Sequence, residues 1–238
     1  MTPTTPFSVT EKIPGDISFI GFHEILEERY YVKIFHWEFT GSAISTVSEE
    51  FGAAILLNNK NAPWRRNYDL AHELFHILTW SIFRILSEAP SEIEEKFANS
   101  FASKLLMPEE PLRQRIAVLV NEQEETPLDR LDDLAREFGV SLDALSYRIA
   151  GLYQIKKGDN EKFLTAVKQL AKFHKPRESD KAEMLPDRYC DLAKRALRDG
   201  RLSLMQFAKY MGISYKKAQE YLTNDEDFTD EKISIPVA

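Results

Sequence analysis

The chain has 238 residues, of which 43% are hydrophobic and 29% charged, so it can bury a core and is neither collagen-like nor wholly disordered. Its single cysteine excludes a disulfide framework and a cysteine-based zinc cluster, and its formal net charge of −7 argues against a protein that coats nucleic acid. The first residues lack the basic and apolar regions of a signal peptide, and no apolar run approaches the roughly 20 residues that cross a bilayer, so we expect a cytoplasmic protein.

The first part of the chain predicts one helix and a few strands. Residues 18–29 fit a short helix, and residues 30–39 are rich in aromatic and β-branched side chains in near alternation, which is typical of a strand. Residues 41–47 fit a strand or a loop. Residues 51–57 are a continuous apolar run that stops at Asn58, and we expect another strand there.

The remainder is predicted to be helical. We expect a long helix over residues 66–86 and a second over residues 92–107, where Ser91 and Glu94 have the spacing of a capping box. Further helical segments are predicted over residues 112–121, 128–149 (two short helices), 161–173 and 186–222.

One short pattern occurs twice. Residues 134–141 and 207–214 each describe a helix that ends at a glycine, followed by an apolar residue and a serine that can cap the next helix, as in a helix-turn-helix. The helix after the first turn suits packing or protein docking better than contact with phosphate, since it carries Leu142, Asp143, Leu145 and Tyr147. Those after the second include Lys216, Lys217 and Gln219, which permit DNA contact, although the acidic balance of the whole chain favours a module that docks on protein.

The residues His72-Glu73-Leu74-Phe75-His76 form the pattern H-E-x-x-H within the first long helix. Helical positions four apart lie about 40° apart around the axis, so both imidazoles leave one face and can bind one Zn²⁺. Glu73 lies beside the first ligand, where it can take a proton from an activated water without binding the metal. Chance gives only about 0.02 such matches in a chain of this composition.

A third ligand is expected on the next helix. Glu95 follows His76 by 19 residues, and two antiparallel helices joined by a short break bring it back toward the histidine pair. Asn99, one turn further, can accept a hydrogen bond from the outer nitrogen of a histidine ligand. Glu94 is the substitute ligand if the register differs by one residue, and Glu95 could instead belong to a solvated run of charge.

Two blocks of sequence resemble the ImmA/IrrE family of metallopeptidases. Residues 71–76 read A-H-E-L-F-H where the family has A-H-E-L-G-H, and residues 95–108 fit its pattern E-x-x-A-N-x-F-A-x-x-L-L-M-P. The resemblance is strong over residues 50–110 and weaker over residues 128–150. The chain departs from the family at Phe75, whose ring either crowds the helix packing or lines a specificity pocket.

The resemblance implies an α+β fold with a minimal zincin-like metallopeptidase domain, in which a small sheet packs on the H-E-x-x-H helix, followed by a mostly helical region with helix-turn-helix-like modules. It implies Zn²⁺, or Mn²⁺, held by His72, His76 and Glu95, with Glu73 as general base. We therefore expect these segments: a peptidase domain over 1–112, a helix-turn-helix-like region over 113–157, a helix and linker over 158–185, and a helical module with an acidic tail over 186–238.

The function that the resemblance implies is cleavage of a partner protein, a helix-turn-helix transcriptional repressor, which releases stress, phage or mobile-element genes. Two other functions stay open. The chain could be a non-cleaving regulatory module of the toxin–antitoxin type, or a DNA-binding regulator that uses residues 186–222.

Residue type and nearness in sequence suggest further site residues. Candidates for stabilising the transition state are Tyr68, His36, Arg65 and Arg66. The apolar run is the candidate edge strand for pairing with an extended substrate, or an ordinary core strand. Its residues are Phe51, Ala53, Ile55 and Leu57.

Overall fold

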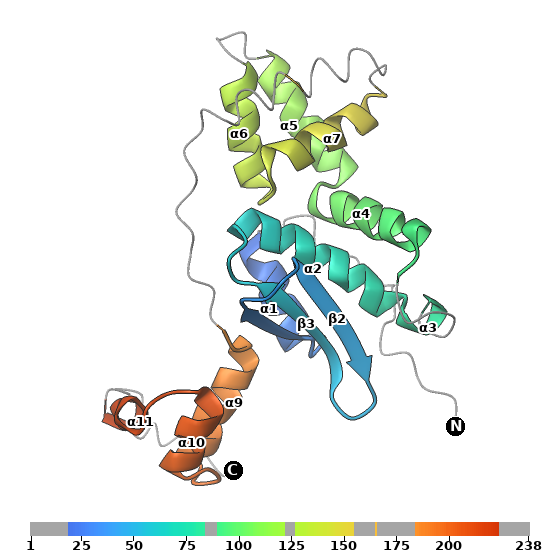
Figure 1. Ribbon diagram of the computed structural model, residues 1–238. Coiled ribbons are helices and arrows are strands. Elements are labelled where there is room, and N and C mark those ends of the chain that lie inside the picture. Colours follow the sequence, from blue (N-terminus) through green and yellow to red (C-terminus); the bar gives the residue numbers. More distant parts are fainter. Residues whose placement is uncertain (1–18, 84–89, 122–126, 155–164, 166–183, 224–238) are drawn as a thin grey trace, which may run out of the picture. The chain divides into compact units, whose positions relative to one another are not determined.

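A computed structural model (Figure 1) describes residues 19–83, 90–121, 127–154, 165 and 184–223. The chain divides into two compact units, Met1–Met184 and Leu185–Ala238, each of which is described by itself. Apart from residue 165, the helix predicted over 161–173 lies outside the described residues, as does the acidic tail. No described helix is long and apolar enough to cross a membrane.

The first unit begins with α1 (Phe19–Glu28) and a three-stranded sheet of β1 (Lys33–Trp37), β2 (Ala43–Ser48) and β3 (Gly52–Asn58). The strand order is β1-β3-β2, with β1 parallel and β2 antiparallel to β3. Residues opposite one another share a face of the sheet. One face therefore carries Ile34, Ser45 and Ile55 from the three strands.

The expectation that residues 51–57 form an exposed sheet edge is wrong. β3 is the central strand and pairs on both sides, so Ala53, Ile55 and Leu57 have no free edge to offer a substrate. Phe51 precedes the strand and stacks on Phe35. A strand buried between neighbours reads as a continuous apolar run, which is the pattern found here. The strand at the edge next to the histidines is β2.

Two helices carry the H-E-x-x-H pattern and the second motif block. α2 (Pro63–Leu78) contacts β2 and β3, and α4 (Glu92–Leu106) packs beside α2. The helix predicted over 66–86 is broken after Leu78, and α3 (Trp80–Phe83) follows. The capping box is confirmed, because Glu94 N–H donates to Ser91 Oγ at 3.2 Å and Ser91 N–H donates to Glu94 Oε2 at 3.4 Å.

The described part of the first unit has three further helices between residues 109 and 152: α5 (Glu109–Asn121), α6 (Pro127–Glu137) and α7 (Leu142–Leu152). One hydrophobic core joins Leu74 of α2 and Ile55 of β3 to Leu112 of α5 and Leu145 of α7. The boundary expected at residue 112 therefore does not separate two cores. The small sheet with its surrounding helices is the predicted α+β architecture.

The second unit contains α9 (Asp187–Arg198), α10 (Leu204–Met211) and α11 (Tyr215–Thr223). Its own small core is built from Ala193, Phe207, Ala208 and Ala218. Between α10 and α11 the chain reverses at Gly212, whose φ of 64° lies in the left-handed region that glycine adopts without strain.

Candidate metal centre

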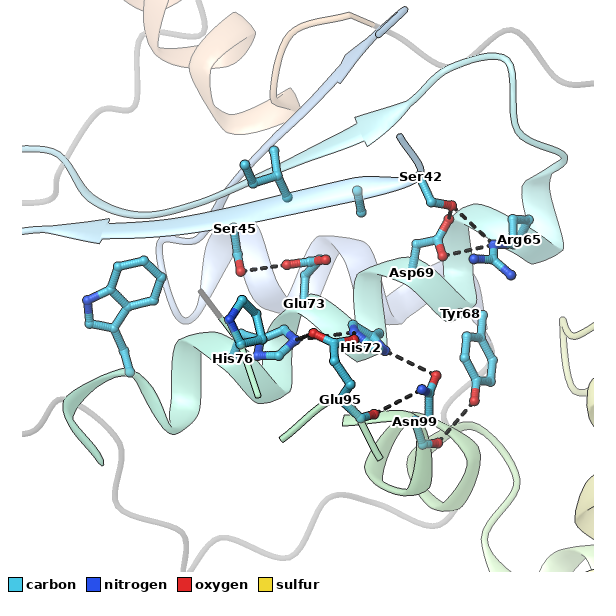
Figure 2. A pocket seen from close by; sticks show the side chains of 14 residues that line it. Ser42, Ser45, Arg65, Tyr68, Asp69, His72, Glu73, His76, Glu95 and Asn99 are labelled. Atoms are coloured by element: carbon cyan, nitrogen blue, oxygen red, sulfur yellow. Dashed lines mark hydrogen bonds and ion pairs between the residues drawn. The ribbon is translucent and has the colours of Figure 1, made fainter. Parts of the chain in front are cut away.

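The two histidines of α2 point from one face of the helix into a pocket between α2, α4 and β2 (Figure 2). Their Nε2 atoms lie 3.2 Å apart, as expected for residues one turn apart. His76 is buried and His72 is partly buried, which keeps both rings in fixed positions.

Glu95 approaches this pair from α4. Its carboxylate oxygens lie 3.2 Å from His72 Nε2 and 3.4 Å from His76 Nε2. Ligands about 2.0–2.1 Å from a tetrahedral zinc ion stand roughly 3.3–3.4 Å from one another. The spacing of these two nitrogens and one carboxylate thus fits three residues that would hold a single ion.

The other nitrogen of each histidine is held by α4. His72 Nδ1 lies 3.2 Å from Asn99 Oδ1, and His76 Nδ1 lies 2.8 Å from Glu94 Oε1. Because each acceptor calls for a proton on Nδ1, the Nε2 lone pairs are free to face the same point. Asn99 Nδ2 donates to Glu95 O at 2.9 Å, which turns the amide oxygen toward His72.

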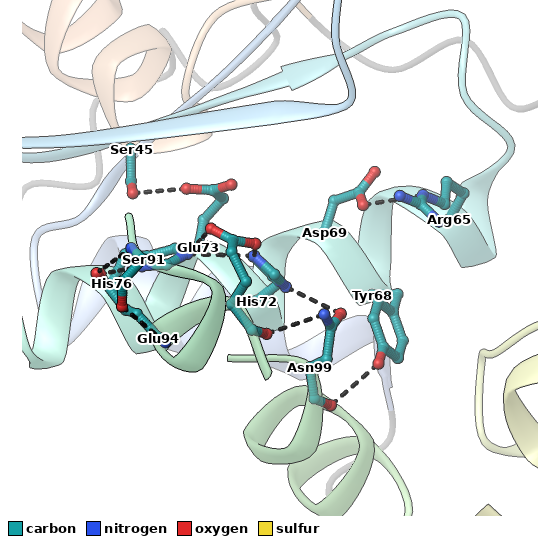
Figure 3. Close-up of polar contacts among 11 residues, drawn as sticks. Ser45, Arg65, Tyr68, Asp69, His72, Glu73, His76, Ser91, Glu94 and Asn99 are labelled. Carbon is teal, nitrogen blue, oxygen red and sulfur yellow. Dashed lines mark hydrogen bonds and ion pairs between the residues drawn. The ribbon is translucent and has the colours of Figure 1, made fainter. Parts of the chain in front are cut away.

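Glu94 has a role that the sequence did not predict (Figure 3). It is not a substitute ligand, because its carboxylate contacts Nδ1 of His76 and not the Nε2 side where Glu95 lies. The side chain is only 3% exposed, and its second oxygen closes the capping box with Ser91. The capping-box spacing was the available signal, since it ties this carboxylate to the first turn of α4.

Glu73 lies between the histidines and the edge strand. Ser45 of β2 donates from Oγ to Glu73 Oε2 at 2.6 Å. Burial raises the pKa of Glu73 from its ordinary value, and the Ser45 hydrogen bond opposes that rise. Sequence reasoning missed Ser45, because its contact with Glu73 depends on the strand register and on how α2 crosses the sheet.

The pocket has a volume of about 510 Å³ and takes its walls from β2, α2 and α4. It is lined by Ser42, Ala43, Ile44, Ser45, Arg65, Tyr68, Asp69, His72, Glu73, His76, Trp80, Pro90, Glu95 and Asn99. At one end of it Arg65 pairs with Asp69 at 2.9 Å, and Ser42 donates to the same carboxylate at 2.5 Å. The charge of Asp69 is thus already matched within the wall.

Two of the candidate stabilising residues line the pocket. Tyr68 donates from its hydroxyl to Asn99 O at 3.0 Å, and burial raises the pKa of its phenol, so it stays neutral and able to donate. Arg65 is the other. The structure does not bring His36 or Arg66 to the pocket.

The reason lies in where their elements run. His36 is on β1, at the opposite edge of the sheet from β2, and its ring stacks on His23 of α1 with centroids 5.8 Å apart. Arg66 is buried and donates to Asn61 O at 2.7 Å, in the turn that precedes α2. Nearness in sequence was therefore a poor guide for these two side chains.

Phe75 is not among the residues that line the pocket, although its ring contacts that of His76 with centroids 5.8 Å apart. Its ring packs against Phe101 of α4 and Phe83 of α3, with centroids 5.7 Å and 6.4 Å apart. Of the two expectations for this departure from the family pattern, helix packing is the one that the geometry supports.

The part of the chain that carries the pocket matches a known protein family. A Mycobacterium tuberculosis transcriptional regulator of known structure is similar at 16% identity and a TM-score of 0.40, over 56% of this chain and 40% of that chain; a likeness this low carries no argument. A search of curated proteins found no match. The family described as the IrrE N-terminal-like domain, Peptidase_M78, matches residues 27–150, which include every lining residue of the pocket. The chain therefore belongs to the ImmA/IrrE family, a family of metallopeptidases.

Proposed function

We propose that the chain is a metal-dependent endopeptidase whose ion, Zn²⁺ or Mn²⁺, is held by His72, His76 and Glu95. The observation that carries the proposal is that the two Nε2 atoms lie 3.2 Å apart and that each has one oxygen of the Glu95 carboxylate nearby, Oε2 at 3.2 Å from His72 and Oε1 at 3.4 Å from His76. Three protein ligands of N and O type, with a corner left open, are the set that catalytic zinc sites use. When bound, the ion polarises the scissile carbonyl and acidifies water.

Glu73 supplies the proton transfers. Its carboxylate is buried beside the ligand pair and is not needed as a ligand, so a purely structural metal site would have no use for it. We assign it two steps. It takes the proton from the water that attacks the carbonyl carbon, and it then delivers that proton to the amide nitrogen as the C–N bond breaks.

The free edge of β2 is the place for the substrate backbone. Asn58 N–H donates to Ser42 O, so the backbone groups of Ser42 face β3, and by antiparallel alternation those of Ala43, Ser45 and Val47 face away from it. No strand in the described part of the chain pairs with that side. An extended peptide can add there as a further strand, beside Glu73.

The substrate is a partner protein with a segment that becomes extended, and we propose a helix-turn-helix transcriptional repressor. This part rests on family membership. Cleavage of such a repressor would release stress, phage or mobile-element genes. Among the pocket residues, Tyr68 is the candidate donor to the carbonyl oxygen of the substrate, for which its hydroxyl would turn away from Asn99 O, the acceptor of its proton in the absence of substrate.

The test is co-expression of a helix-turn-helix repressor encoded beside this chain with either wild type or Glu73→Gln, followed by mass spectrometry of the repressor. We expect discrete fragments with wild type and the intact repressor with the variant. A peptide library digested by the purified protein with added Zn²⁺ or Mn²⁺ tests cleavage without assuming the partner. Equal digestion by both proteins, or none by either in both assays, would overturn the proposal and favour a non-cleaving module.

A further inference from the structure

The second unit presents a helix-turn-helix whose second helix is exposed and basic, and it lies beyond residues 27–150, the part of the chain that matches the family. We propose that this unit binds duplex DNA, with the first turn of α11 entering the major groove. This function is separate from the peptidase site and does not depend on it.

The turn between α10 and α11 is rigidly specified. Ser203 and Gln206 form a capping box at the start of α10, Gly212 adopts its left-handed conformation, and Ile213 N–H donates to Ala208 O at 3.0 Å. Ser214 then caps α11 by accepting from Lys217 N–H at 3.2 Å. A fixed angle between two short helices is what positions a recognition helix in a groove.

The first turn of α11 is exposed to solvent, because the helix packs on its neighbours through other residues. Ala218 is fully buried and Tyr221 is partly buried against Phe207, so the helix contacts its neighbours through one narrow side. Lys216 and Lys217 are exposed, and Tyr215 is 51% exposed. These are the positions from which helix-turn-helix proteins contact base edges and phosphates.

The helical part of this unit is more basic than the chain as a whole. Residues 184–223 contain eight lysines and arginines and four acidic residues, whereas the whole chain has a formal net charge of −7. Lys209 and Arg201, on and next to α10, are also exposed. Residues 224–238 add one lysine and five acidic residues, so the whole second unit has equal numbers of basic and acidic residues. The basic character belongs to the surface of the described helices, and that surface is complementary to the phosphate backbone.

The first helix-turn-helix serves as an internal control. Its turn is built in the same way, with Gly139 at a φ of 61° and Val140 N–H donating to Ala135 O at 2.9 Å. The residue that corresponds to Lys216 is the acidic Asp143, and Leu142 and Leu145 of the same helix are buried in the main core. The turn alone thus does not indicate DNA binding; the exposed basic helix does.

The experiment is fluorescence anisotropy of the full-length protein with a labelled 30-base-pair duplex of mixed sequence, titrated at several salt concentrations. Wild type should bind with a dissociation constant of about 10⁻⁶–10⁻⁴ M at physiological salt and more tightly at low salt. Lys216→Glu/Lys217→Glu should weaken binding at least tenfold and lower the slope of log K against log salt by about two.

Lys104→Glu, an exposed lysine of α4, makes the same chemical change on the first unit and should leave the affinity within about twofold. Thermal unfolding by circular dichroism checks that each variant is folded. No binding by wild type at low salt overturns the proposal, as does equal weakening by Lys104→Glu, or tighter binding of a single strand of the same length. Glu73→Gln should bind the duplex as wild type does, so this result is independent of the peptidase assay.

Discussion

The two helix-turn-helix segments share one turn and use the following helix in opposite ways. In the first, Leu142 and Leu145 of α7 are buried in the core that also supports α2. In the second, α11 buries Ala218 and leaves Lys216 and Lys217 exposed. A local sequence pattern therefore specifies a turn, and the burial and charge of the next helix determine whether it stabilises a domain or presents a surface.

The same contrast holds for the polar residues of the two units. Among the described residues, the buried charged side chains lie in the first unit, where His76 bonds Glu94 and Glu73 accepts a hydrogen bond from Ser45. Those of the second unit are at its surface. Buried ionisable groups that fix one another's positions suit chemistry, and exposed lysines suit electrostatic binding. Substitutions should therefore separate the two activities.

The largest effect is expected from Glu73→Gln. Removing a general base lowers cleavage by about 10²–10⁴-fold. Among the described residues, the other buried carboxylate next to the pair is that of Glu94, and it bonds Nδ1 of His76 and so does not replace Glu73. Initial rates on the peptide library measure it, and duplex binding of the same protein is the control. Undiminished cleavage would contradict the role of Glu73 as general base. A matching loss of duplex binding would contradict the claim that the two units act independently.

The next largest effect is expected at the position that directly follows the capping serine in each of the two helix-turn-helix segments. Leu142→Ala should lower the free energy of unfolding of the first unit by about 2–5 kcal/mol, since the side chain is 7% exposed. Tyr215→Ala, at the same position of the second pattern and 51% exposed, should change stability by no more than about 0.5 kcal/mol.

Urea unfolding of the full chain makes this measurement. All three tryptophans (Trp37, Trp64 and Trp80) lie in the first unit, so their fluorescence follows that unit alone, while far-UV circular dichroism follows both. Equal destabilisation by the two substitutions would mean that the two helices are buried alike and would remove the basis of the comparison.

Glu94→Gln should weaken metal binding by about 10- to 100-fold, because the neutral amide holds the His76 ring less firmly in the ligating tautomer. Competition with a chromophoric chelator gives the dissociation constant. Glu92→Gln is the matched control, as it makes the same change at an exposed position in the same first turn of α4. If both variants bind the ion like wild type, Glu94 does not hold the His76 ring for metal binding.

Patterns set by local spacing were predictable from the sequence. The histidine pair, the capping box at Ser91 and the helix-turn-helix at Gly212 depend on residues within one or two turns of each other. Features that depend on the order of the strands in the sheet were not predictable from the sequence. The apolar run at residue 55 indicated a buried strand, and only the pairing shows that it is central and that Ser45 of β2 faces Glu73.

The smallest expected effect follows from that missed contact. Ser45→Ala removes the hydrogen bond that lowers the pKa of Glu73, so the pKa rises further. Because the base works ionised, the acid limb of the pH profile of kcat/KM should move to higher pH, with little change well above the limb. Ser42→Ala, whose hydroxyl bonds Asp69 instead, should leave the limb in place.

The central claim is that His72, His76 and Glu95 hold one divalent ion, and metal analysis of the purified full-length protein tests it most directly. After equilibration with Zn²⁺ and removal of free metal, we predict one equivalent per chain in wild type and in Glu73→Gln, and well below that in His76→Ala and in Glu95→Ala. Substoichiometric metal in wild type, or a full equivalent retained by both ligand variants, would contradict the account.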